Sequence, residues 1–132
     1  MRNASGLPKE KMTMKFKDVI YNIEISTIIT DTISWSDIPI YHKNGKRTYQ
    51  VKIYCTDSST LVRTIANADE LNFFIDTLTK LAYHCEYNFK SSVDVLDLVS
   101  KIYHILWWDI GYMVDSANNI VKEVTGLDLA SL

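Results

Sequence analysis

The feature that most constrains this chain is a single change in hydrophobic periodicity near residue 67. Before that point apolar and polar residues alternate, as in a half-buried strand, and after it apolar residues recur every three to four positions, as in an amphipathic helix. At 132 residues, 47% of them hydrophobic, the chain can bury the core of one domain. We predict one α+β domain over residues 14–132, an antiparallel meander of about four strands followed by two C-terminal helices, the last one long. Residues 1–13, which lack periodicity, are predicted to be a flexible N-terminal segment.

The strongest local signal in the first half is Asn44-Gly45 between two alternating runs. This dipeptide favours a two-residue hairpin turn and sets a register in which Ile38 faces Val51. The prediction is therefore a hairpin of strands near 33–43 and 46–55. A strand that begins at Phe16 would precede it, and a strand at 60–66 would follow it.

The second half carries start and stop signals for helices. Asn67, with Glu70 three residues later, is close to a capping box, and the helix it begins is predicted to end near Asn88. Ser91 begins a second helix that ends at Gly126. Its apolar residues follow an unbroken heptad spacing, and Gly111 is the one weak point. That seam consists of Leu96, Val99, Tyr103, Leu106, Ile110, Met113, Ala117, Ile120 and Val124.

Charge is unevenly divided along the chain. Residues 1–54 carry nine Lys and Arg against five acidic residues, whereas residues 55–132 carry five against eleven. This division is typical of two solvated faces of opposite sign, or of an acidic surface that meets a basic partner. Cys55 and Cys85 are predicted to be buried free thiols, which suits a reducing compartment. With no apolar signal segment and no membrane-spanning run, we expect a cytoplasmic location and no membrane partner.

No motif for catalysis or cofactor binding is found in the sequence. The four glycines are isolated at 6, 45, 111 and 126, so no phosphate-binding loop is present. The histidines at 42, 84 and 104 and the two cysteines lack the spacing of a zinc site. Cys85 with His104, and Asp94 with Asp97, are the arrangements closest to catalytic ones, and both have ordinary structural explanations. We therefore expect no enzyme, no catalytic residue, no metal and no cofactor.

A candidate partner-binding face lies on the second predicted helix. If the heptad seam faces the core, Trp108 lies about 175° away from it, at 100° per residue. Trp and Tyr are favoured anchors of protein interfaces because they bury much area and keep one polar group. The alternatives are that another element covers these rings, or that the seam pairs with a second copy in a homodimer. The candidate residues are Asp97, Lys101, His104, Trp108, Tyr112 and Asp115.

The tip of the predicted hairpin is a second candidate surface. Basic residues there, with Tyr41 and Tyr49 nearby, could contact phosphates and stack on bases. Charged side chains at a hairpin tip also keep sheet edges soluble, which is the alternative explanation. The residues of this secondary or nucleic-acid contact are Lys43, Lys46, Arg47 and Lys52.

In overall type the chain resembles the small anti-defence proteins of phages and mobile elements, including anti-CRISPR inhibitors of effector nucleases. The resemblance lies in a composition with 15 Ile and 8 Tyr, the sheet-plus-helices plan, the acidic second half and the lack of a catalytic motif. It implies a non-enzymatic inhibitor that occludes a functional surface of a larger protein, such as a CRISPR effector nuclease or another nucleoprotein complex. The net charge of −2 differs from that of a strong DNA mimic. A nucleic-acid-binding module and a toxin immunity protein are the alternatives.

Overall fold

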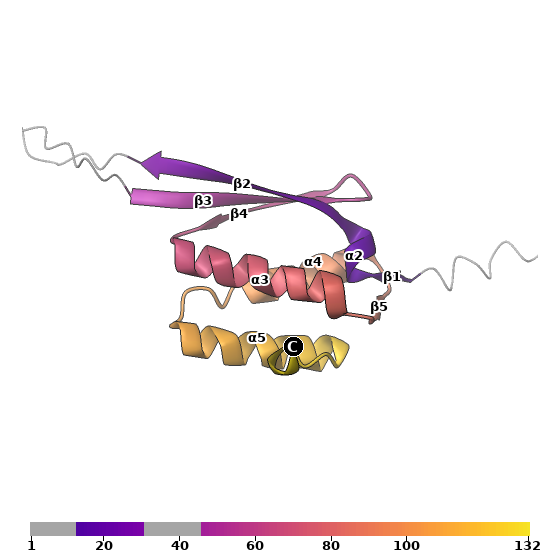
Figure 1. Ribbon diagram of the computed structural model, residues 1–132. Helices are drawn as coiled ribbons and strands as arrows, with labels where there is room; N and C mark the ends of the chain where they lie inside the picture. The colour runs from indigo at the N-terminus through magenta and orange to yellow at the C-terminus, as the bar shows by residue number, and fades with distance from the viewer. Residues whose placement is uncertain (1–12, 31–45) are drawn as a thin grey trace, which may run out of the picture.

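The structure, a computed structural model, describes residues 13–30 and 46–132. Its architecture is α+β, with a three-stranded antiparallel sheet above a layer of helices (Figure 1), as the periodicity predicted. The elements in chain order are β1 (Met14–Lys15), α2 (Phe16–Val19), β2 (Ile20–Thr30), β3 (Lys46–Cys55), β4 (Thr60–Ile65), α3 (Ala68–His84), β5 (Asn88–Phe89), α4 (Ser92–Tyr103), α5 (Ile110–Thr125) and the 3-10 turn η2 (Leu129–Ser131).

The main sheet is a meander in the order β2-β3-β4. Along β3, Val51 lies opposite Ile25 of β2 on one side and Arg63 of β4 on the other. The predicted register, with Ile38 opposite Val51, is therefore wrong, because both edges of β3 already have partners. The whole predicted strand at 33–43, Ile38 included, lies outside the described residues. The strand predicted at 60–66 is β4, so the second half of the meander is confirmed.

The start of the first strand also differs from the prediction. Residues Phe16–Val19 form one helical turn, α2, in which Phe16 and Val19 are both buried. The Asp18 carboxylate accepts a hydrogen bond from the Lys15 backbone N–H at 3.3 Å, which stabilises the turn. Positions i and i+3 share one face of a helix but lie on opposite faces of a strand, so a helical turn buries Phe16 and Val19 on the same side, which a strand could not do. The chain becomes extended at Ile20, with a register shift before Asn22.

The helical half follows its predicted start signals. The Asn67 side chain accepts a hydrogen bond from the Glu70 backbone N–H at 2.9 Å, and α3 begins at the next residue. Ser91 is the N-cap of α4, although its side chain makes no capping hydrogen bond. Gly126 ends α5 with φ of 80°, the left-handed conformation that favours glycine. The predicted long last helix is interrupted, however, and forms α4 and α5 with a turn at residues 104–109 between them.

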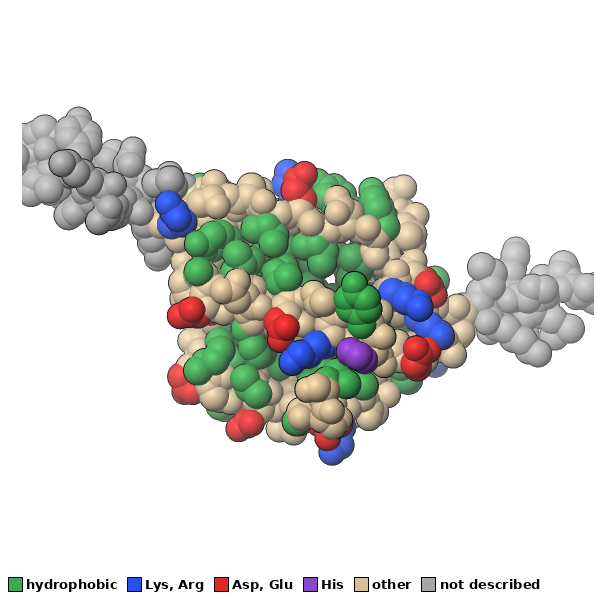
Figure 2. Space-filling view, in the orientation of Figure 1, with side chains coloured by type: hydrophobic (Ala, Val, Ile, Leu, Met, Phe, Trp, Pro, Cys, Tyr) green, Lys and Arg blue, Asp and Glu red, His purple; other side chains and the backbone are tan. Residues whose placement is uncertain are grey.

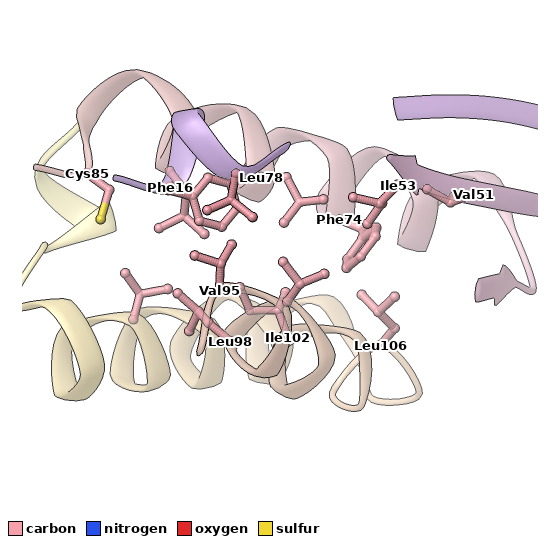
Figure 3. Close-up of a cluster of buried hydrophobic side chains, with 14 of the residues drawn as sticks. Phe16, Val51, Ile53, Phe74, Leu78, Cys85, Val95, Leu98, Ile102 and Leu106 are labelled. Carbon is pink, nitrogen blue, oxygen red and sulfur yellow. The ribbon is translucent and has the colours of Figure 1, made fainter. Parts of the chain in front are cut away.

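The core lies between the sheet and the helices. In Figure 3, Val51 and Ile53 of β3 lie beside Phe74 of α3, and Ile102 of α4 lies below them. Cys55 and Cys85 are free and buried, as predicted. The short β1-β5 pair joins the start of the described chain to the α3–α4 connection. In Figure 1, α3 and α4 lie beneath the sheet and α5 lies on their far side.

Candidate functional site

The turn between α4 and α5 is where the structure presents most exposed aromatic area. Leu106 is buried and attaches the turn to the core. Short-range backbone bonds, such as Leu106 N–H to the Tyr103 carbonyl at 3.2 Å, tighten the end of α4. The Asp109 carboxylate accepts a hydrogen bond from the Tyr112 backbone N–H at 3.1 Å and so begins α5. The turn is therefore held at its ends and through Leu106, and both tryptophans are free to face solvent.

Trp108 and Tyr112 form what we call the aromatic surface, and the adjacent Trp107 lines a separate hollow with Thr48 and Thr64 of the sheet. Trp107 is 79% exposed, Trp108 58% and Tyr112 50%. The rings of Trp108 and Tyr112 have centroids 5.0 Å apart at an interplanar angle of 45°. Aromatic side chains left in water to this extent are anchors that a partner can bury. The sequence left open whether another element covers Trp108 and Tyr112; in the structure both are exposed, and the adjacent Trp107 is more exposed still.

The other predicted partner-binding residues do not form one continuous face with this pair. Because the chain turns between α4 and α5, the assumption of a single long helix is wrong. Asp97 and Lys101 form an ion pair on α4 at 3.3 Å, whereas Asp115 lies on α5 and lines a hollow beside α3. His104 caps the end of α4, with its ring 5.6 Å from that of Tyr103. Of the six residues, Asp97 contacts Lys101 on α4 and Trp108 contacts Tyr112 at the start of α5, so the structure places them in separate groups.

The basic residues of the second candidate surface are not gathered on one side of the sheet. Lys43 lies outside the described residues, and Lys46 is the first residue of β3. Arg47 and Lys52 stand at odd and even positions of the same strand, so their side chains face opposite sides of the sheet. Lys52 lies opposite Glu24 of β2, which offsets its charge.

Groups suited to catalysis or metal binding are sparse in the described part of the chain. Residues 13–30 and 46–132 contain no cluster of three His, Cys, Asp or Glu side chains that could hold a metal ion. Burial raises the pKa of the Cys55 thiol, which keeps it protonated and unreactive. Asp94 and Asp97 line a shallow recess with Lys90 and Lys101 and have cations as neighbours.

Sequence reasoning named Trp108 and Tyr112 but not Trp107, which at 79% is the most exposed large hydrophobic side chain of the described residues. The signal was present in the pair Trp107-Trp108, because two adjacent indoles on one helix cannot both face the same core. Comparison of the chain with protein-family models, curated proteins and solved structures found no match. Within the described ranges no helix combines the length and the apolar character that a membrane crossing requires.

Proposed function

We propose that this protein is a non-enzymatic inhibitor that binds a larger protein and occludes one of its functional surfaces. The observation that carries the proposal is the exposure of Trp107, Trp108 and Tyr112 at one turn. An aromatic side chain buries about 150–250 Å² in an interface, and each Å² of apolar area removed from water contributes about 25 cal/mol. Such a site supplies affinity without a catalytic group.

The identity of the partner is proposed from the resemblance described above. The anti-CRISPR-like resemblance lies in composition and plan, and it favours a cytoplasmic partner of the nucleoprotein kind, such as a CRISPR effector nuclease. A toxin is the alternative partner, and this chain would neutralise it in the same way, by occluding its functional surface. Direct nucleic-acid binding has less support, because Arg47 and Lys52 face opposite sides of the sheet.

The first test identifies the partner and then measures the aromatic surface. A tagged chain is used to capture proteins from host lysate with and without nuclease, and mass spectrometry identifies what remains. We expect one stoichiometric protein that survives nuclease treatment. A captured set that disappears with nuclease would contradict the proposal and favour nucleic-acid binding, whose affinity falls steeply with salt.

The second step uses the purified partner and isothermal titration. The double variant Trp108→Ala, Tyr112→Ala is expected to weaken binding by about 2 kcal/mol or more while leaving the fold intact. Tyr83→Ala is the matched control, because Tyr83 is 78% exposed on α3 and lies outside the aromatic surface. Equal affinity of the folded double variant and the control would refute the assignment of this surface.

A further inference from the structure

A hollowed surface lies between α3 and α5. Both helices flank α4, and two hollows of about 580 and 150 Å³ follow one another along the space between them. The two hollows share Phe73 and Asp76 of α3, so they form one furrow, which we call the α3–α5 groove. Figure 2 shows apolar side chains between these two helices, with acidic side chains around them.

The floor of the groove includes apolar side chains that the fold leaves in water. Ile110 is 56% exposed and Val114 49% exposed on α5, and Phe73 is half-buried on α3. Residues 110 and 114 are four apart on α5, as 69, 73 and 76 are three or four apart on α3, so each set lies on one helix face. The groove is therefore an elongated apolar strip and not an isolated exposed side chain.

The rim of the groove is acidic. Asp69 and Asp76 stand on α3, and Asp115 stands on α5. Lys80, which also lines the groove, is paired with Asp76 at 3.3 Å. In the described parts of the chain, no lysine or arginine forms an ion pair with Asp69 or Asp115. The rim therefore keeps a net negative charge beside an apolar floor.

We propose that the α3–α5 groove binds an amphipathic helix of a partner protein, with an apolar face toward the groove and Lys or Arg along its flanks. The lining residues run from 69 to 80 on α3 and from 110 to 118 on α5, so at 1.5 Å per residue the groove is about 12–17 Å long, and Leu129 and Ala130 of η2 line its smaller hollow. Two to three turns of a partner helix match that length. Placed opposite α4, that helix completes a four-helix arrangement of the kind that buries apolar stripes from all sides.

Charge disfavours a second copy of this chain as the occupant. Residues 66–132, which contain α3, α4 and α5, carry four Lys and no Arg against ten acidic residues. Any of these helices placed in the groove would bring like charges to the rim, which opposes association. A basic helix supplied by another protein gains apolar burial and charge pairing together. The inference requires a protein partner but does not require the aromatic surface to be the main contact.

The test uses the full chain and two synthetic helical peptides as probes. Both peptides have 18 residues and the same Leu and Ala stripe, and their flanks are Lys in one and Glu in the other. Fluorescence anisotropy is expected to show that the Lys-flanked peptide binds at least tenfold more tightly than its Glu-flanked counterpart. Chemical-shift changes in backbone amide spectra are expected to map to α3 and α5.

Two sets of variants test separately how the apolar floor and the acidic rim of the groove contribute to peptide binding. Ile110→Ser with Val114→Ser is expected to weaken the Lys-flanked peptide at least tenfold, and circular dichroism checks that the fold is retained. Asp69→Asn, Asp76→Asn and Asp115→Asn together are expected to remove the preference for the Lys-flanked peptide. Val93→Ser, at a site 70% exposed on α4, is the matched control and should bind as the unmodified chain does.

Three outcomes would overturn the inference: no binding of either peptide at 1 mM, equal binding of both, or shift changes confined to other elements. A concentration-dependent dimer in sedimentation velocity, abolished by the Ile110→Ser, Val114→Ser variant, would assign the groove to a second copy and also overturn it. The Trp108→Ala, Tyr112→Ala variant should bind the Lys-flanked peptide normally. The experiments can therefore refute the proposal for the groove and the proposal for the aromatic surface independently of each other.

Discussion

Helices α4 and α5 come from one uninterrupted heptad pattern, yet they have different surroundings. In α4, four of twelve residues are buried, namely Val95, Leu98, Val99 and Ile102. In α5, only Met113, Ala117 and Val121 of sixteen residues are buried. The first helix lies between the other helices and is part of the core, whereas the second covers one side and exposes both of its flanks. The same periodicity thus yields one helix that stabilises the fold and another that presents surfaces.

The largest difference is expected from truncation of one side chain on each helix. Ile102 in α4 is fully buried, so Ile102→Ala should lower the free energy of unfolding by about 2–5 kcal/mol. Val114 in α5 is 49% exposed, and Val114→Ala should change it by no more than about 0.5 kcal/mol. Urea unfolding measures both. Equal losses would show that α5 contributes to the core as much as α4 does.

A smaller effect is expected at the two glycines of α5 and its C-cap. Gly126 has φ of 80°, so Gly126→Ala should destabilise the protein by about 1–2 kcal/mol. A Cβ at Gly111 would meet only the Asp109 Oδ1 atom, at 3.5 Å, an ordinary contact. Gly111→Ala should therefore stabilise the helix by up to about 1 kcal/mol. Thermal unfolding of the two variants should shift in opposite directions, and a shift of the same sign would contradict this account of α5.

Removal of the N-cap side chain should destabilise the protein more at α5 than at α4. Asp109 accepts a hydrogen bond from the Tyr112 backbone N–H, whereas the Ser91 side chain makes no capping bond. Asp109→Ala should cost about 1 kcal/mol of unfolding free energy, and Ser91→Ala should cost less. If the two variants unfold at the same urea concentration, α5 does not depend on its cap more than α4 does.

The smallest effect concerns how α4 is attached to the sheet. The Asp57 carboxylate, in the turn between β3 and β4, accepts hydrogen bonds from the Ser59 hydroxyl and backbone N–H and from the Ser92 hydroxyl of α4. These bonds, first those from Ser59, lower the pKa of Asp57 from 3.8 to about 2. The folded-state pKa is depressed, so the stabilisation is present above the ordinary value and is lost as pH falls from about 4 toward 2.

Acid unfolding of the unmodified chain and Asp57→Asn checks this assignment. The variant should be less stable near neutral pH, and its stability should fall less between pH 4 and pH 2. Asp94→Asn, at an exposed site in the first turn of α4, is the control. An identical pH profile for Asp57→Asn and the unmodified chain would show that this contact does not contribute.

Much of the fold could be predicted because its signals are local. The change of period near residue 67, the Asn67 cap, the Ser91 start and the Gly126 stop each involve a few neighbouring residues, and the structure bears them out. Two of the errors lie before residue 67. Asn44-Gly45 indicated a hairpin with strand 33–43, but β3 instead pairs with β2 and β4. Phe16 and Val19 are three residues apart, a spacing that suits one face of a helical turn and not one face of a strand, and α2 buries both.

The candidate site, like the fold, was predicted only in part. The rings of Trp108 and Tyr112 do meet, although Trp108 lies in the turn before the Asp109 N-cap and not in a helix with Tyr112, as the predicted spacing assumed. The break at residues 104–109 separated Asp97 and Lys101 from that pair, and it placed Ile110 and Val114 beside α3. An interruption that reverses the chain direction leaves little trace in periodicity, because the apolar spacing continues across it.

The sequence by itself determined the class of the fold, the starts of α3 and α4, the end of α5 and the aromatic character of one turn, since these depend on residues within one or two turns of each other. Only the tertiary structure decided which strands pair, where the long helix breaks and which apolar residues remain in water. Those outcomes depend on how helices and strands distant in the chain share the same buried area. Ile110 illustrates the difference: it fits the heptad seam, yet 56% of its surface is exposed. It begins α5 and lines the hollow beside α3 instead of the core.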